Sequence, residues 1–127
     1  MAVCQQLGIK NDLIPRIATP FAGGMARTGG VCGAVVGALM CIGIKQGREE
    51  PTQSDIEGHV LSQQFLRRFR DEMGSIQCRE LTGMDLSTPD GLQAYRSSDV
   101  RPRVCLPAAG LAYRLVLELL EERHPGA

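Results

Sequence analysis

The segment that decides the fold is FAGGMARTGGVCGAVVGALMCIG, residues 21–43, in which a glycine-rich connection leads through Cys32 into small apolar residues. Glycine adopts backbone dihedrals that other residues avoid, and it lets another segment approach closely. The uncharged apolar run over residues 31–44 is shorter than the roughly 20 residues that a membrane-spanning helix needs. We therefore expect a buried helix from about Gly30 to Ile44, with Gly43 and Gly47 near its end.

Helical signals continue on both sides of this segment, and strand signals are weak throughout. Upstream, Asn11 or Asp12 can cap a short helix that ends near Thr19. Downstream, residues 54–74 form the strongest pattern, with Ser54 and Glu57 as a capping box. Its glycine stop is residue 74. The apolar stripe of this predicted helix consists of Ile56, Val60, Leu61, Phe65, Leu66, Phe69 and Met73.

The C-terminal half predicts further helices. Residues 76–83 read as a short helical turn ended by Gly83, and residues 87–98 place Pro89 in the first turn of another helix. A final amphipathic helix runs from about Pro107 to Arg123 and is ended by residues 125–126. The sum predicts an all-α fold, a compact helical bundle of about five helices, with residues 1–127 as one domain.

The composition excludes several classes of function. Lys plus Arg and Asp plus Glu both number 14, so the formal net charge is zero. A nucleic-acid-binding protein usually carries a basic excess or a basic face, and we expect no such partner here. No leader with a basic region and a long apolar core is visible, so we expect no membrane span and a cytoplasmic location.

Five cysteines are the most informative residues for function: Cys4, Cys32, Cys41, Cys78 and Cys105. In a reducing compartment, cysteines indicate catalysis, redox sensing or metal binding more often than structural disulfides. The chain contains neither CxxC nor CxxCH, so zinc ribbons and covalently attached haem lack their sequence motifs. A metal or iron–sulfur centre assembled from cysteines distant in sequence remains open.

Cys32 has two interpretations. It falls at the start of the predicted helix, where unpaired N–H groups and the helix dipole stabilise a thiolate, and Arg27 lies nearby. Alternatively, it is a small core residue of a helix whose Gly33 and Gly37 allow close helix packing. Cys41 lies nine residues further on, about half a turn away around the helix, and is interpreted as a core residue.

Cys78 and Cys105 also lie near predicted helix ends, from which a side chain can reach another element. Other kinds of site have little support. The segment GGMARTGG matches neither glycine-rich nucleotide motif. The two histidines, His59 and His124, are isolated in sequence.

These features resemble the C_GCAxxG_C_C family, whose redox activity is inferred from its cysteines. Cys32, Gly33, Ala34 and Gly37 supply CGAxxG, residues 78–81 supply the CREL segment, and Cys105 matches the final cysteine. The resemblance covers nearly the whole chain but is short at the N-terminus. The family's first cysteine aligns before Met1, so Cys4 is not its equivalent.

The resemblance implies that Cys32, Cys78 and Cys105 converge and that Cys41 stands apart. The leading hypothesis is a redox-active protein in which Cys32 is the reactive thiolate and the other two are resolving partners or metal ligands. The redox partner protein and any cofactor are not specified by the sequence, and whether the chain is an enzyme stays open. The alternative is a structural or interaction module that forms a homo-oligomer, such as a homodimer, with inert buried cysteines.

Overall fold

The structure is a computed structural model, which describes residues 1–123 and the side chains of residues 1–122. The predicted helix stop at residues 125–126 and His124 therefore lie outside the described residues. The α-helices are α1 (Ala2–Gln6), α2 (Leu13–Ala18), α3 (Gly33–Gln46), α4 (Ile56–Met73), α5 (Cys78–Thr82), α6 (Pro89–Ser97) and α7 (Leu106–Arg123). A 3₁₀ turn (Thr19–Phe21) follows α2, and a π-helical segment (Arg101–Cys105) precedes α7.

The all-α prediction is confirmed, since the described residues form helices and no strand. Within residues 1–123 there are seven α-helices rather than the expected five or so, because α1 was not predicted and α5 was predicted only as a turn. None of the helices in the described part of the chain is long and apolar enough to cross a membrane.

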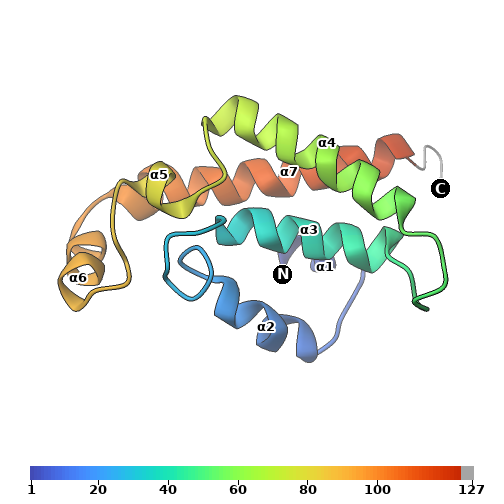
Figure 1. Cartoon of the computed structure of the whole chain (residues 1–127), viewed down its shortest axis with the longest axis horizontal. Coiled ribbons are helices and arrows are strands. Elements are labelled where there is room, and N and C mark those ends of the chain that lie inside the picture. The colour runs from blue at the N-terminus through green and yellow to red at the C-terminus, as the bar shows by residue number, and fades with distance from the viewer. Residues whose placement is uncertain (124–127) are drawn as a thin grey trace.

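The three long helices α3, α4 and α7 pack against one another and form the core (Figure 1). Phe65 and Phe69 of α4 are fully buried, and their ring centroids lie 5.8 Å apart. Fully burying a phenylalanine stabilises the fold by about 1.5–3 kcal/mol, so the apolar stripe of α4 anchors the bundle. The other fully buried large side chains come from α3 and α7 and are Val35, Ile42, Val116 and Leu119.

Helix ends confirm two of the predicted stops. Gly74 and Gly83 follow α4 and α5 with φ angles of 85° and 68°, in the left-handed region that favours glycine. The capping box is wrong: α4 begins at Ile56 with Asp55 as its N-cap residue. The hydroxyl of Ser54 instead accepts from the Ile56 N–H at 3.4 Å.

The small residues of α3 do not act as predicted. A Cβ placed on Gly37 would meet no atom within 4 Å, so this position is not a close helix–helix contact. A Cβ on Gly33 would lie 3.2 Å from the carbonyl oxygen of Phe21, which belongs to the preceding connection. The tight approach in this region is therefore between the start of α3 and the backbone of Phe21 and Ala22 before it.

One end of the bundle gathers the segments that carry the candidate residues. In Figure 1 the connection of residues 22–32 and the start of α3 lie at the same end as α5, α6 and the start of α7. This end is built from short elements and loops rather than from the long helices. It is consequently where side chains from distant parts of the sequence can meet.

Candidate functional site

A β-bridge between two loops places Cys32 beside Cys78. Val31 pairs antiparallel with Gln77, and two backbone hydrogen bonds flank the pair. The Cys32 N–H donates to the Ile76 carbonyl and the Cys78 N–H to the Gly30 carbonyl, both at 2.7 Å. Side chains alternate between the two faces of a β-ribbon, so both thiols leave it on the face opposite Val31 and Gln77. Cys32 and Cys78 are diagonal neighbours on that face, and the residue directly opposite Cys78 across the bridge is Gly30.

Both cysteines also stand at helix starts, as the sequence predicted. Cys32 is the N-cap residue of α3, and Cys78 is the first residue of α5. Cys78 is buried and Cys32 is half-buried. The Val31–Gln77 bridge thus lies immediately before the start of α3 and of α5, and it sets the relative positions of Cys32 and Cys78.

The glycine-rich connection allows this close approach. A Cβ on Gly24 would lie 2.5 Å from the Cβ of Cys78 and 2.6 Å from the Gly30 carbonyl oxygen. Gly23 and Gly24 both have φ of 71°. The three residues that follow are not glycine, yet their φ angles are also positive, from 54° to 64°, and they are Met25, Ala26 and Arg27.

A left-handed conformation costs a non-glycine residue roughly 1–2 kcal/mol, so the surrounding structure must hold this turn in place. Backbone hydrogen bonds do so: the Gly30 N–H donates to the Gly24 carbonyl at 2.8 Å, and the Arg27 N–H donates to the Ala22 carbonyl at 3.0 Å. The hydroxyl of Thr28 adds a bond to the Gly24 carbonyl at 3.0 Å.

Cys105 reaches the same region from the C-terminal half. It is the last residue of the π-helical segment, immediately before α7, and it is half-buried. The Tyr95 hydroxyl of α6 donates a hydrogen bond to its sulfur at 3.3 Å. Single π-helical turns are frequent at functional sites.

The three predicted cysteines line one cavity of about 390 Å³. This volume falls within the range of small-molecule sites, roughly 300–1,000 Å³. Its walls come from the glycine-rich connection, the start of α3, α5, the loop before α6, α6 itself and the start of α7. Besides Cys32, Cys78 and Cys105, the lining residues are Ala22, Gly23, Gly24, Arg27, Gly33, Ala34, Leu86, Leu92, Tyr95, Arg96 and Ala109.

The ionisation of these groups is coupled. Burial raises the pKa of the Cys78 thiol, and negative charge on Cys32 and on Cys105 raises it further. Burial likewise raises the pKa of Tyr95 to about 12, with contributions from its hydrogen bond to Cys105 and from charge there. The thiols are therefore close enough that a proton leaving one makes the next harder to remove.

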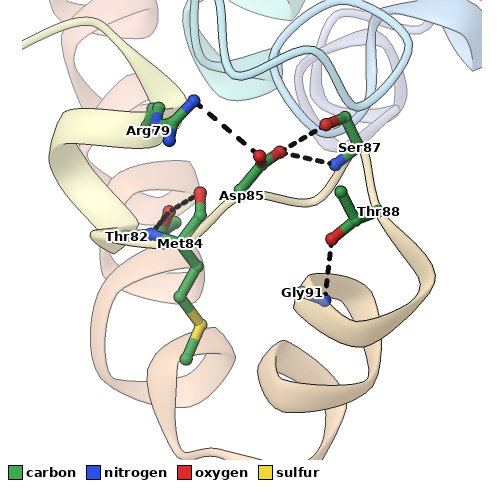
Figure 2. Close-up of polar contacts among 7 residues, drawn as sticks. All are labelled: Arg79, Thr82, Met84, Asp85, Ser87, Thr88 and Gly91. Atoms are coloured by element: carbon green, nitrogen blue, oxygen red, sulfur yellow. Dashed lines mark hydrogen bonds and ion pairs between the residues drawn. The ribbon is translucent and has the colours of Figure 1, made fainter.

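The loop between α5 and α6 supplies one wall of the cavity through buried Leu86. Figure 2 shows how polar contacts hold it. Asp85 accepts hydrogen bonds from both the N–H and the hydroxyl of Ser87, and it faces the Arg79 guanidinium at 3.9 Å. The Ser87 bonds, together with Arg79, lower the pKa of Asp85. At the far end of the loop, the Thr88 hydroxyl caps α6 by accepting from the Gly91 N–H at 3.0 Å.

The other two cysteines form a separate pair in the core, which sequence reasoning missed. Cys4 of α1 and Cys41 of α3 are both buried in the same hydrophobic cluster. Burial raises the pKa of Cys41 to about 11, helped by the charge of Cys4 and a hydrogen bond with it. Cys41 thus stands apart from Cys32, as expected from helix geometry. Its contact with Cys4 had no sequence signal because it depends on how α1 packs.

A metal centre fits the described residues poorly. Among them, no group of three or more His, Cys, Asp or Glu side chains is arranged to hold a metal ion. Three cysteines line the cavity, but their sulfur atoms do not form a ligand set.

The fold and this cavity define a small helical protein with three thiols gathered at one end of its bundle. The chain belongs to the C_GCAxxG_C_C family, whose description is "Putative redox-active protein (C_GCAxxG_C_C)" and which it matches over residues 1–119. The family description supports a general redox role. Comparison with curated proteins and with solved structures found no match.

Three residues of the site were not singled out from the sequence: Gly24, Tyr95 and Arg96. Tyr95 lies ten residues before Cys105 on a different helix, and no motif links the two. Arg96 had no signal either, because an exposed arginine at a helix end is common. Gly24 belongs to the glycine-rich connection, but only the approach of Cys78 shows why that particular residue must be small.

Proposed function

We propose that the protein carries out thiol–disulfide exchange at Cys32, Cys78 and Cys105. The observation that supports this most is that three thiols from three separate segments line one cavity. A purely structural cysteine needs neither a second thiol beside it nor a cavity. A site for thiol–disulfide exchange needs a cavity in which a mixed disulfide can form with an external sulfur. It also needs a second protein thiol that resolves this mixed disulfide.

In this proposal the thiolate of Cys32 attacks one sulfur of an external disulfide. A sulfur–sulfur bond forms to Cys32, and the other half of the external disulfide leaves as a thiolate that takes up a proton. Cys78 or Cys105 then attacks the sulfur of Cys32, which releases the second half as a thiol. The sum oxidises two protein thiols to a disulfide and reduces one external disulfide to two thiols, with the protons of the protein thiols transferred to the products.

The assignment of Cys32 as the attacking residue rests on its surroundings. It is half-buried, while Cys78 is buried, so an external disulfide reaches Cys32 more easily. As the N-cap residue of α3, Cys32 also stands at the end of the helix where the helix dipole is positive. Cys78 and Cys105 are then the resolving candidates.

The test is oxidation of the reduced protein by an external disulfide, followed by peptide mass spectrometry. We expect a disulfide between two of the three cavity cysteines, and a trapped mixed disulfide at Cys32 when both resolving cysteines are changed to serine. The matched control is Cys41→Ala, because Cys41 is a cysteine of α3 outside the cavity. It should leave the reaction unchanged.

The competing interpretation, an interaction module with inert cysteines, gives a different result. All thiols would then react slowly and together, only as the protein unfolds. That outcome, or a largest effect from Cys41→Ala, would contradict the proposal. Metal analysis of the purified reduced protein is a further test: stoichiometric metal lost in the Cys32, Cys78 and Cys105 variants would indicate coordination rather than exchange.

A further inference from the structure

The cavity that contains the thiols has an unusual balance of charge. Of its lining residues, only Arg27 and Arg96 carry a formal charge at neutral pH, and no acidic side chain lines it. The large uncharged side chains that line the cavity are aliphatic or aromatic, and they are Leu86, Leu92 and Tyr95. An apolar cavity with two cations suits a ligand with an apolar middle and anionic ends.

The two guanidinium groups are available for such a ligand. Within the described part of the chain, neither Arg27 nor Arg96 forms an ion pair, so no carboxylate of the protein competes for these two cations. Both residues are exposed to solvent. Arg27 comes from the glycine-rich connection and Arg96 from the last turn of α6, so they approach the cavity from different segments.

The loop geometry holds Arg27 in place. A Cβ on Gly23 would lie 2.7 Å from both the Cα and the Cγ of Arg27, so the stem of the arginine packs directly against this glycine. The positive φ of 63° at Arg27 belongs to the left-handed turn described above. This turn places Arg27 in the wall of the cavity that the three cysteines line, at a conformational cost that a surface arginine in a relaxed loop would not have.

We propose that the cavity selects an anionic low-molecular-weight disulfide, with Arg27 and Arg96 binding its carboxylates while Cys32 attacks its sulfur. This inference rests on the proposed exchange reaction. In this reaction one dicarboxylate disulfide accepts two electrons and becomes two carboxylate thiols. Two cavity cysteines supply those electrons and become a disulfide. Without the arginines, the attacking thiolate would repel an anionic substrate.

The experiment compares three dialkyl disulfides of similar size and different charge with the reduced protein. These are 3,3′-dithiodipropionate (anionic), bis(2-hydroxyethyl) disulfide (neutral) and cystamine (cationic). Because the three leaving thiols differ in pKa, each rate is divided by the rate of the same disulfide with a small neutral thiol. We expect this normalised rate to be about tenfold higher for the anionic compound than for cystamine at low salt. This ratio should shrink at 1 M salt, where the Debye length falls to about 3 Å.

Arginine variants assign the effect to residues. Arg27→Gln and Arg96→Gln should each reduce the preference, and the double variant should abolish or reverse it. The matched control is Arg67→Gln, which removes an exposed charge of α4 that does not line the cavity. Equal normalised rates for the three disulfides, or a preference that survives in the double variant, would refute the inference while leaving thiol exchange intact.

A probe without sulfur separates this inference from the proposed function. Suberate is the dicarboxylate in which two methylene groups replace the sulfurs of 3,3′-dithiodipropionate. We expect it to shift the amide NMR signals of Gly23 and Gly24 and to protect Cys32 from alkylation, in the wild type but not in the double variant. If suberate binds and no disulfide reacts, the exchange proposal fails and the anion site stands. If suberate does not bind, the anion site is refuted.

Discussion

Replacing Gly24 by alanine tests the contact that brings Cys78 against the glycine-rich connection. The added Cβ would lie 2.5 Å from the Cβ of Cys78 and 2.6 and 2.7 Å from the oxygen and nitrogen of Gly30. Carbon atoms pack best at about 3.5–4.0 Å, so the loop or α5 has to move by about 1 Å. Two of the three neighbours are backbone atoms, which cannot rotate away as the end of a side chain can.

Two energetic effects add. Alanine in the left-handed region costs roughly 1–2 kcal/mol, and overpacking of a tight contact typically costs about 1–3 kcal/mol. Gly8→Ala is the matched control, because Gly8 has φ of 70° and a Cβ there would meet nothing within 4 Å. In both variants alanine adopts a left-handed conformation, and in both it restricts the unfolded chain. The difference between their free energies of unfolding therefore measures the contact of residue 24 with Cys78 and Gly30. We expect Gly24→Ala to lose about 1–3 kcal/mol more than Gly8→Ala.

The assay is urea denaturation followed by circular dichroism, with thermal melts as a second measurement. For a chain of this length, the expected difference corresponds to a melting temperature about 3–12 °C lower than that of Gly8→Ala. Displacement of Cys78 should also slow resolution of the mixed disulfide at Cys32, which Gly8→Ala should leave unaffected. Equal losses of stability in the two variants would refute the close approach of Gly24 and Cys78.

Two further predictions use the raised pKa values. In a Tyr113→Phe background, the phenolate absorbance of Tyr95 should appear with a pKa of about 12, and Cys105→Ala should lower it; an unchanged value would mean that Cys105 does not influence Tyr95. The free energy of unfolding should fall by up to about 3 kcal/mol between pH 9 and 11, because folding keeps the proton on Cys41 that the unfolded chain releases. Cys41→Ala should flatten this decline, and an unaltered slope in that variant would count against the buried thiol as its cause.

The helices were largely predictable because their signals are local. The apolar stripe of residues 56–73, the glycine stops at 74 and 83, and Pro89 at the start of α6 all act within a few residues of the chain. The capping box was wrong by one residue, since Asp55 rather than Ser54 takes the N-cap position and makes no side-chain capping hydrogen bond there. The π-helical turn of residues 101–105 was not predicted from the sequence.

The candidate site was predictable in part. Helix ends and the family resemblance selected Cys32, Cys78 and Cys105, and the structure brings all three to one cavity. The sequence predicted the wrong role for Gly37, because small residues spaced by four can pack against a helix or simply face open space. Which of these occurs depends on the size of side chains elsewhere in the bundle.

By itself, the sequence determined where the longer helices lie and that Cys32 stands at a helix start, since both depend on hydrogen bonds and apolar spacing within one segment. Only the tertiary structure decided which thiols meet. The Val31–Gln77 bridge joins Cys32 to Cys78, α6 brings Tyr95 to Cys105, and α1 brings Cys4 to Cys41. These pairings join segments far apart in the chain, and their geometry is set by the packing of the whole bundle rather than by any motif within one segment.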